Sequence, residues 1–213
     1  MKVSVIIPAY NSERFISRAV RSAIDQDLSS DLYEIIVVND GSTDNTKTIL
    51  DLYKNKIKII NHEKNYGLPT ARNTGIKNAC GRYILNLDSD DYIDSTLLSI
   101  GCKYLDLNPD IDAVSFDYIL VDDREKHISR CCAGDHPIAC GIFFRMEQLI
   151  EIGLYDTSFK LREEEDLMIR FKKKYSVYNV ILPLYRYRKH NGNITNNLVS
   201  MKNYKQKLNE KHK

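Results

Sequence analysis

The sequence predicts an α/β fold, namely an open and mostly parallel sheet of Rossmann-like outline with helices on both faces. Short and mostly apolar runs recur through the first part of the chain, and stretches with helical spacing of apolar side chains lie between them. Strands of this kind are typical of parallel sheets that are buried on both faces. The chain has 213 residues, 43% of them apolar, which is enough for one sizeable core.

The predicted elements follow one another as strand and helix in turn. The first apolar run ends at Pro8, and the helix after it has Ser12 as a candidate N-cap. The expected strands lie at 3–7, 35–38, 57–60 and 83–87. The expected helices lie at 12–26, 43–53 and 69–79.

Polar loops follow three of the predicted strands. They occupy residues 8–11, 40–42 and 88–91. In open parallel sheets, ligands bind in the crevice outside the carboxyl ends of the strands, where such loops converge. We therefore expect the three loops to form a single binding site at one edge of the sheet.

The third loop lies in the sequence NLDSDDYID, which places Asp88, Asp90, Asp91 and Asp94 within seven positions. Carboxylates this close repel one another and need a positive partner. The chain has no GxGxxG after its first strand, no GxxxxGK[ST] and no EF-hand spacing. A divalent cation that carries phosphates fits better, because Mg²⁺ takes one or two carboxylates with substrate oxygens and Mn²⁺ accepts similar ligands. Asp94 is expected only to precede the next helix.

The cysteines give no sign of a disulfide framework. There are five of them, an odd number, and no paired CxxC knuckles occur. A zinc site built from Cys131, Cys132, His136 and Cys140 is an alternative, although adjacent cysteines fit one tetrahedral ion poorly. We expect reduced and mostly buried thiols.

Charge and hydropathy predict a cytoplasmic protein without a nucleic-acid partner. The formal net charge is only +2, no run reaches the roughly 18 apolar residues of a membrane span, and the first residues lack the pattern of a cleavable signal peptide. Residues 202–213 contain five lysines and one glutamate. Such a tail is usually solvated, and the alternative is a weak peripheral contact with anionic lipid on the inner face of the membrane.

Four segments taken together resemble glycosyltransferase family 2, whose members are inverting enzymes of the GT-A type. The segments are SVIIPAYN at 4–11, EIIVVNDGSTD at 34–44, GLPTARNTG at 67–75 and DSDD at 88–91. Weaker signals continue to residue 195. The resemblance implies a donor-binding half at 1–111, an acceptor-binding and catalytic-base half with a smaller mixed sub-region at 112–198, and a basic tail at 199–213.

The resemblance assigns the residues that bind the nucleotide-sugar. Asp40 would accept a hydrogen bond from the imide N–H of the base, which favours uracil or thymine over cytosine, and uracil fits the set best. Arg72 would bind near the base or the diphosphate, and Asp88 would contact the ribose. The full set implied for the nucleotide-sugar is Pro8, Ala9, Tyr10, Asp40, Arg72, Asp88 and Ser89.

The resemblance also implies a cofactor, a divalent metal that is Mn²⁺ or Mg²⁺. Asp90 would be its direct ligand, with Asp91 in support. His190, in a closing segment similar to that of the family, would ligate the metal or contact the diphosphate. A purely structural histidine is the alternative at that position.

A catalytic base is implied at a helix start, within REEEDLMIRF at 162–171. The family usually carries a Glu-Asp pair there, whose second member removes the proton of the acceptor hydroxyl. The literal pair makes Asp166 the base, whereas the register of the buried helix face makes Glu163 and Glu164 the pair and Glu164 the base. We favour Glu164, and Asp166 would then pair with Arg170 one turn further on. Without the family context, a solvated acidic helix start would be the ordinary interpretation.

The resemblance therefore implies a metal-dependent inverting hexosyltransferase. It would move a sugar from a nucleoside diphosphate, UDP-sugars being favoured, to a saccharide or lipid-linked saccharide acceptor in the synthesis of bacterial surface polysaccharide or lipid-linked glycan. A non-catalytic module that binds nucleotide-sugars is one alternative. A sugar-phosphate nucleotidyltransferase is another, but its glycine-rich activating loop is missing after the first strand. The sequence names neither the sugar nor the acceptor.

Overall fold

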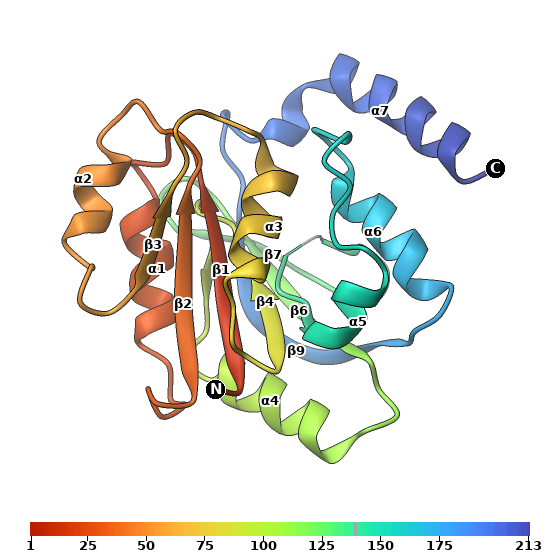
Figure 1. Ribbon diagram of the computed structural model, residues 1–213, viewed down its shortest axis with the longest axis horizontal. Coiled ribbons are helices and arrows are strands. Elements are labelled where there is room, and N and C mark those ends of the chain that lie inside the picture. Colours follow the sequence, from red (N-terminus) through yellow and green to blue (C-terminus); the bar gives the residue numbers. More distant parts are fainter. Residues whose placement is uncertain (139) are drawn as a thin grey trace.

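The computed structural model describes residues 1–138 and 140–213, and Figure 1 shows one mixed sheet with helices packed on both of its faces. Within these ranges the sheet has nine strands in the order β3-β2-β1-β4-β8-β6-β9-β5, with β7 paired to β6 off this path. In chain order the strands are β1 (Val3–Ala9), β2 (Tyr33–Asn39), β3 (Lys58–Asn61), β4 (Tyr83–Asn86), β5 (Tyr92–Ile93), β6 (Ala113–Val121), β7 (His127–Cys131), β8 (Phe143–Arg145) and β9 (Val177–Arg188). The helices are α1 (Ile16–Ile24), α2 (Thr46–Asp51), α3 (Leu68–Lys77), α4 (Leu97–Leu107), α5 (Met146–Glu151), α6 (Glu163–Lys172), the 3-10 helix η1 (Ile194–Asn196) and α7 (Leu198–Lys211).

The first part of the chain confirms the predicted alternation of strand and helix. β1 pairs in parallel with β2 and β4, and β2 pairs in parallel with β3. The predicted N-cap is wrong, because α1 begins only at Ile16 and the hydroxyl of Ser12 caps no helix. That hydroxyl lies instead 2.7 Å from the hydroxyl of Ser89, so it joins two loops at the edge of the sheet.

The side chains of β1 alternate between two core layers. Val3, Val5 and Ile7 pack in a cluster with α1, α2 and α4, whereas Ile6 packs in a second cluster with α3, α5 and α6. This is the period of two that a strand buried on both faces requires. The helices therefore cover both faces of the sheet, and the carboxyl ends of its parallel strands are left to loops.

The second part of the chain adds the mixed region of the sheet. β8 is antiparallel to both β4 and β6, while β9 is parallel to β6 and antiparallel to β5. β5 pairs with β9 at Tyr92 and Arg186, so the end of β9 lies beside the aspartate-rich loop that precedes β5. The predicted halves thus share one sheet, and their boundaries at 111 and 198 stay a prediction.

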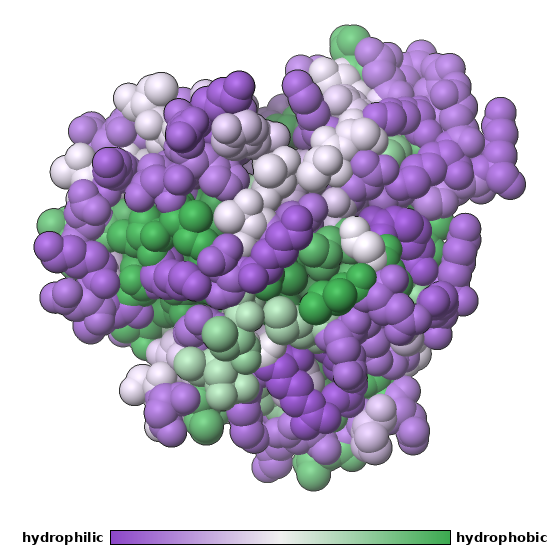
Figure 2. Space-filling view, viewed as in Figure 1, coloured by the Kyte–Doolittle hydropathy of each residue, from purple (hydrophilic) through white to green (hydrophobic). Residues whose placement is uncertain are grey.

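Helix α7 folds back against the segment that leads into α6, and its surface in Figure 2 is largely hydrophilic. The amine of Lys207 donates to the carbonyl of Ser158 at 2.6 Å, and the amine of Lys211 lies 2.7 Å from Asp156 Oδ2. Two lysines of the basic tail are therefore engaged within the chain, and nothing in the structure supports a contact between the tail and a membrane. None of the described helices is long and apolar enough to cross a lipid bilayer.

Gly75 of α3 lies against β1 with no room for a side chain. A Cβ atom at this position would lie 2.3 Å from Cγ2 of Ile6, which is fully buried. We expect Gly75→Ala to lower the free energy of unfolding by about 1–3 kcal/mol, because overpacking outweighs the roughly 1 kcal/mol by which alanine favours a helix over glycine. Urea unfolding followed by circular dichroism measures the change. Lys77→Ala, at an exposed position of the same helix, is the control, and unchanged stability of Gly75→Ala would contradict this packing.

Candidate active site

The three predicted loops meet at the carboxyl ends of β1, β2 and β4. The N–H of Asp40 donates to the carbonyl of Ala9 at 2.8 Å, which joins the loops after β1 and β2. The 2.7 Å contact between the hydroxyls of Ser12 and Ser89 joins the loop after β1 to the aspartate-rich loop after β4. The structure therefore confirms that the three loops lie together at one edge of the sheet.

The residues predicted to line the nucleotide base lie at the start of this edge. Pro8 and Ala9 are buried at the end of β1, and Tyr10 follows them with 47% of its surface exposed. Of these three, Tyr10 alone presents a large side chain to solvent. Contact with a base stays a prediction for all of them.

Asp40 is buried and fixes the turn that leads into α3. Its Oδ1 lies 2.6 Å from Nδ1 of His62 and accepts a hydrogen bond from the N–H of Tyr66 at 3.0 Å, and its Oδ2 accepts from the N–H of Gly67 at 2.8 Å. A carboxylate has about four acceptor positions, so one more hydrogen bond fits. A bond from the imide of a base stays a prediction.

Arg72 of α3 joins the donor-side loop to α6. Its side chain is only 1% exposed, and its guanidinium lies 2.8 Å from Asp88 Oδ1 and 2.7 Å from Glu163 Oε1. Because Glu163 is the first residue of α6, this buried bridge brings the acidic start of that helix to the edge of the sheet. Arg72 thus lies beneath Asp88, and a direct contact with the nucleotide stays a prediction.

Burial and neighbouring charges act in opposite directions in this bridge. Burial raises the pKa of Glu163 to about 8, although the adjacent Arg72 opposes the change, and Glu164 adds to it. Burial disfavours the charge of Arg72, yet Asp88 and other nearby groups hold its pKa well above its usual value. Arg72 is therefore the positive group that offsets the acids Asp88, Glu163 and Glu164 at this edge. A further cation bound here would be stabilised by the negative charge that remains.

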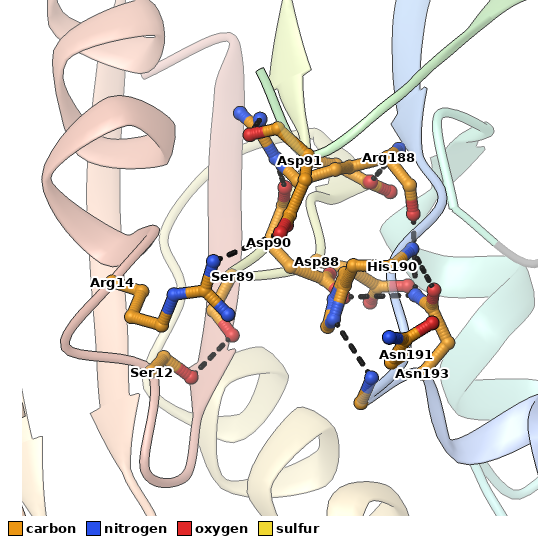
Figure 3. A network of polar contacts seen from close by, with 12 residues as sticks. Ser12, Arg14, Asp88, Ser89, Asp90, Asp91, Arg188, His190, Asn191 and Asn193 are labelled. Carbon is orange, nitrogen blue, oxygen red and sulfur yellow. Dashed lines mark hydrogen bonds and ion pairs between the residues drawn. The ribbon is translucent and has the colours of Figure 1, made fainter. Parts of the chain in front are cut away.

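The predicted metal pair, Asp90 and His190, lies face to face in Figure 3. Asp90 Oδ2 is 2.9 Å from Nε2 of His190 and accepts a hydrogen bond from the amide of Asn193 at 3.2 Å. Burial and the neighbouring Asp88 raise the pKa of Asp90. The fold thus brings together two residues that lie a hundred positions apart in the sequence.

This donor set fits a hard divalent cation. A carboxylate oxygen and an imidazole nitrogen already face each other, and the charge of Asp88 close to Asp90 is what a bound cation would offset. Among the described residues, Asp88, Asp91 and Cys140 also have possible ligand atoms within 4.8 Å of one another. Burial holds the pKa of the Cys140 thiol well above its usual value. Its sulfur is also a softer donor than the oxygen ligands that Mg²⁺ and Mn²⁺ prefer, so it suits such an ion poorly.

Asp91 supports the loop from inside the protein. Its Oδ1 accepts from the N–H of Arg188 at 2.7 Å, and its Oδ2 accepts from the hydroxyl of Tyr185 at 2.7 Å. Nε of Arg188 donates in turn to the carbonyl of Asp90 at 2.8 Å. The end of β9 therefore fixes the backbone of the aspartate-rich loop and the carboxylate of Asp91. The support that Asp91 would give to a metal ligand stays a prediction.

Asp166, one of the two candidate bases, is fully buried between α6 and α7. Its carboxylate accepts from Nε of Arg170 at 2.9 Å, and it lies 2.8 Å from Nε2 of His212 and 2.6 Å from the amine of Lys211. Burial alone would raise the pKa of Asp166, but these hydrogen bonds lower it below its usual value. The pairing with Arg170 is confirmed, and it holds Asp166 in a structural network.

Glu164, the other candidate base, is partly exposed. It lies close enough to the buried bridge for its charge to raise the pKa of Arg72 and of Tyr155. Of the two candidates, Glu164 is therefore the one electrostatically linked to the donor-side loop. Its role as the base stays a prediction.

Two residues of this edge have a weak signal in the sequence. Glu163 stands within a run of four acids, and only the helix register separates it from its neighbours. Asn193 contacts Asp90 across 103 positions, a separation that spacing alone does not disclose. The polar residues that directly follow His190 in the closing segment are the hint that the sequence offers for Asn193.

The prediction about the cysteines holds only in part. All five are free, but only Cys102 and Cys140 are buried, while Cys80 is exposed and the adjacent Cys131 and Cys132 are half-buried. Within residues 1–138 and 140–213, no group of metal-ligand spacing combines these two with His136. The zinc alternative has no support.

Comparison with known proteins shows what the chain is similar to. A family model described as Glycosyl transferase family 2 matches residues 4–148. The poly(ribitol-phosphate) beta-N-acetylglucosaminyltransferase TarS of Staphylococcus aureus is 41% identical over 109 residues, which are 50% of this chain and 19% of that protein. An uncharacterized glycosyltransferase of Rickettsia prowazekii is 30% identical over 216 residues, which cover 93% of this chain and 67% of that protein.

Solved structures show the same relationship. S. aureus TarS 1-349 in complex with UDP-GlcNAc superposes with a TM-score of 0.79 at 25% identity, covering 92% of this chain and 61% of that one. A mannosyltransferase from Pyrobaculum calidifontis in complex with GDP-Man and Mn²⁺ is alike in fold alone, with a TM-score of 0.75 at 18% identity over 94% of this chain and 60% of that one. The predicted GT-A type fold is confirmed. On the family match and the likeness to these relatives, the chain belongs to glycosyltransferase family 2.

Proposed function

We propose that the protein transfers a sugar from a nucleoside diphosphate donor, a UDP-sugar by preference, to a hydroxyl group of a saccharide-type acceptor, with inversion at the anomeric carbon. The observation that carries the proposal is the buried bridge Asp88–Arg72–Glu163. It holds the acidic start of α6 beside the loop predicted to bind ribose and metal. An acid that can act as a base therefore stands where donor and acceptor would meet.

The relatives support the choice of donor and acceptor. UDP and UDP-GlcNAc are the ligands named for solved complexes of TarS. Similar curated proteins are poly(ribitol-phosphate) glycosyltransferases, one from S. aureus for N-acetylglucosamine and one from Bacillus spizizenii for glucose. We therefore propose a uridine nucleotide and an acceptor of the bacterial surface-polysaccharide or lipid-linked glycan class. The two named sugars differ, so the sugar of this protein stays open.

In the proposed reaction Glu164 takes the proton of the acceptor hydroxyl. The oxygen of that hydroxyl then attacks the anomeric carbon of the donor sugar. The attack comes from the face opposite the diphosphate, so one displacement inverts the configuration. Asp88, held by Arg72, orients the ribose, and Asp40 reads the imide of the base. The positive charge of Arg72 beneath Asp88 also favours the negative charge that develops on the leaving diphosphate.

Asp90 and His190 are the residues that would hold Mn²⁺ or Mg²⁺. When bound, such an ion offsets the charge of the leaving diphosphate. Asn193 keeps Asp90 and His190 in register through its hydrogen bonds to Asp90 Oδ2 and to the N–H of His190, and the end of β9 holds the loop from below. The predicted cytoplasmic location and the membrane contact of the basic tail stay predictions from the sequence.

Nucleotide binding tests the donor and the metal site directly. We expect saturating UDP with Mn²⁺ to raise the melting temperature by about 5–10 °C, since a ligand at a hundred times its Kd adds about 2.7 kcal/mol. GDP and ADP should give smaller shifts, and Asp90→Asn should remove the part that depends on Mn²⁺. Asp94→Asn is the control, because Asp94 belongs to the same aspartate group but lies 3.3 Å from Arg186 and outside the site.

A rise in melting temperature as large with GDP as with UDP would overturn the donor assignment. A rise that is the same with and without Mn²⁺ would overturn the metal site. Release of nucleoside diphosphate in the presence of acceptor distinguishes a transferase from a module that only binds. The same product distinguishes sugar transfer from nucleotidyl transfer. The bridge to Glu163 argues against the binding module, because the acidic start of α6 is not displaced from the edge.

A further inference from the structure

An open groove lies between the segment before α6, the loop after β9 and helix α7, and its lining combines polar residues with the apolar Leu161 and Ile194. Its volume is about 690 Å³, within the range of small-molecule sites. The groove is lined by Lys160, Asn191, Asn193, Asn197, Ser200 and Tyr204, among others. No residue of the proposed reaction except Asn193 belongs to it.

The groove begins where the proposed chemistry takes place. Asn193 lines it and also donates to Asp90 Oδ2, and Asn191 directly follows His190. Figure 3 shows Asn191 and Asn193 beside that histidine. The opposite wall includes Lys160, three positions before the first residue of α6. A chain lying in the groove would therefore end between the predicted metal pair and the acidic start of α6.

The wall formed by α7 is held firmly to the protein. Nε of Arg162 donates to the carbonyl of Met201 at 2.9 Å, and Lys207 and Lys211 bind Ser158 and Asp166. The amide of Asn196 donates to the carbonyls of His190 and Asn191, which ties the loop after β9 together. The groove is thus built by specific contacts on both of its sides.

Several lining groups are free to meet a ligand. Among the residues that the structure describes, the side chains of Lys160, Asn191 and Ser200 and the hydroxyl of Tyr204 make no hydrogen bond. Amide and hydroxyl groups donate and accept in equal measure, as the hydroxyls of a polyol or sugar do, and the ring of Tyr204 offers an apolar surface to carbon-bound hydrogens. Lys160 adds one positive charge that suits a phosphate.

We propose that this groove binds the acceptor, a polyhydroxylated chain that carries phosphate. Tyr204 packs against its carbon face, Asn191 and Ser200 bind its hydroxyls, and Lys160 binds a phosphate group. This inference deepens the proposed function and rests on it, since it names the acceptor class of the same reaction. The loops predicted to bind the nucleotide base, 8–11 and 40–42, follow β1 and β2 and do not line the groove.

Calorimetric titration of the UDP-loaded protein tests the groove without requiring turnover. The probes are poly(ribitol phosphate) and, as a neutral chain, an oligosaccharide of four N-acetylglucosamine units. We expect Tyr204→Ala to raise the Kd of both probes about tenfold, or 1.4 kcal/mol. Lys160→Ala should raise the Kd of poly(ribitol phosphate) several-fold and leave that of the neutral chain within twofold. Neither change should alter the Kd of UDP.

The matched controls are Asn203→Ala and Lys202→Ala, exposed positions of α7 that do not line the groove. Unchanged binding of both probes to Tyr204→Ala, an equal loss in the controls, or failure of the wild type to bind either probe while it binds UDP would overturn the groove as the acceptor site. An equal effect of Lys160→Ala on both probes would overturn the phosphate contact. Failure of UDP itself to bind would instead overturn the proposed function.

Discussion

Glu164→Gln lowers the rate of sugar transfer by about 10²–10⁴-fold, the usual contribution of a positioned general base. The amide retains the size of the side chain but cannot take the proton of the acceptor hydroxyl at neutral pH. The affinity for UDP should stay within a few-fold, because Glu164 lies on α6 and not in the loops predicted to bind nucleotide. Release of UDP from the donor, measured at saturating acceptor, gives the rate, and thermal shift with UDP gives the affinity.

Asp166→Asn and Glu165→Gln are the matched controls for this prediction. Asp166 binds the side chains of Arg170, Lys211 and His212 inside the protein, so its replacement should lower stability while the folded fraction keeps a rate near that of the wild type. Glu165 is paired with Arg162 at the surface and should matter little. A larger loss of rate in folded Asp166→Asn than in Glu164→Gln would reverse the assignment of the base.

Arg72→Met lowers the free energy of unfolding by about 3–5 kcal/mol, the cost of leaving a buried charge without its partner. Methionine fills much of the same space, but the carboxyl groups of Asp88 and Glu163 then have no cation between them. We also expect weaker UDP binding, because Asp88 loses the contact that holds it. Urea unfolding measures the stability, and calorimetry measures the affinity.

Arg82→Met is the matched control for the bridge. Its side chain is 66% exposed and lies 3.7 Å from Asp106, so the loss should be within about 1 kcal/mol. Adding Glu163→Gln to Arg72→Met should restore part of the stability above pH 8, because the amide stays neutral there, whereas the carboxyl of Glu163, with a pKa of about 8, loses its proton and needs a cation. Equal losses for Arg72→Met and Arg82→Met would show that the bridge is not the buried pair described above.

The donor half could be predicted from the sequence because its signals are local. The run 3–7 is apolar except for Ser4, since β1 is buried on both faces. The loops at 40–42 and 88–91 follow strands whose ends a parallel sheet must align. The same logic placed Asp88 and Asp90 at one edge. Ser12 shows the limit of local signals: its type suits a helix cap, but a neighbouring loop supplies Ser89 as the partner that the fold uses.

The rest of the site depends on contacts between distant segments. His190 reaches Asp90 only because β9 runs beside β6 and then pairs with β5, a topology that no spacing in the sequence specifies. Glu163 becomes the partner of Arg72 because α6 starts at the edge of the sheet, and the acidic run by itself is equally compatible with a solvated helix start. Composition and spacing assign no role to these distant segments. The family resemblance did so, because it linked the closing segment with His190 and the acidic helix start to the donor-side loops.

The course of β9 implies that the metal loop is completed late in folding. Asp91 receives its hydrogen bonds from Tyr185 and Arg188, which lie 94 and 97 residues further along the chain. A chain emerging from the ribosome can pair β1, β2 and β4 early, but its aspartate-rich loop stays without these contacts until nearly the whole domain has been made. Contacts of such long range slow folding, and here they delay the assembly of the acidic site until the sheet that supports it is in place.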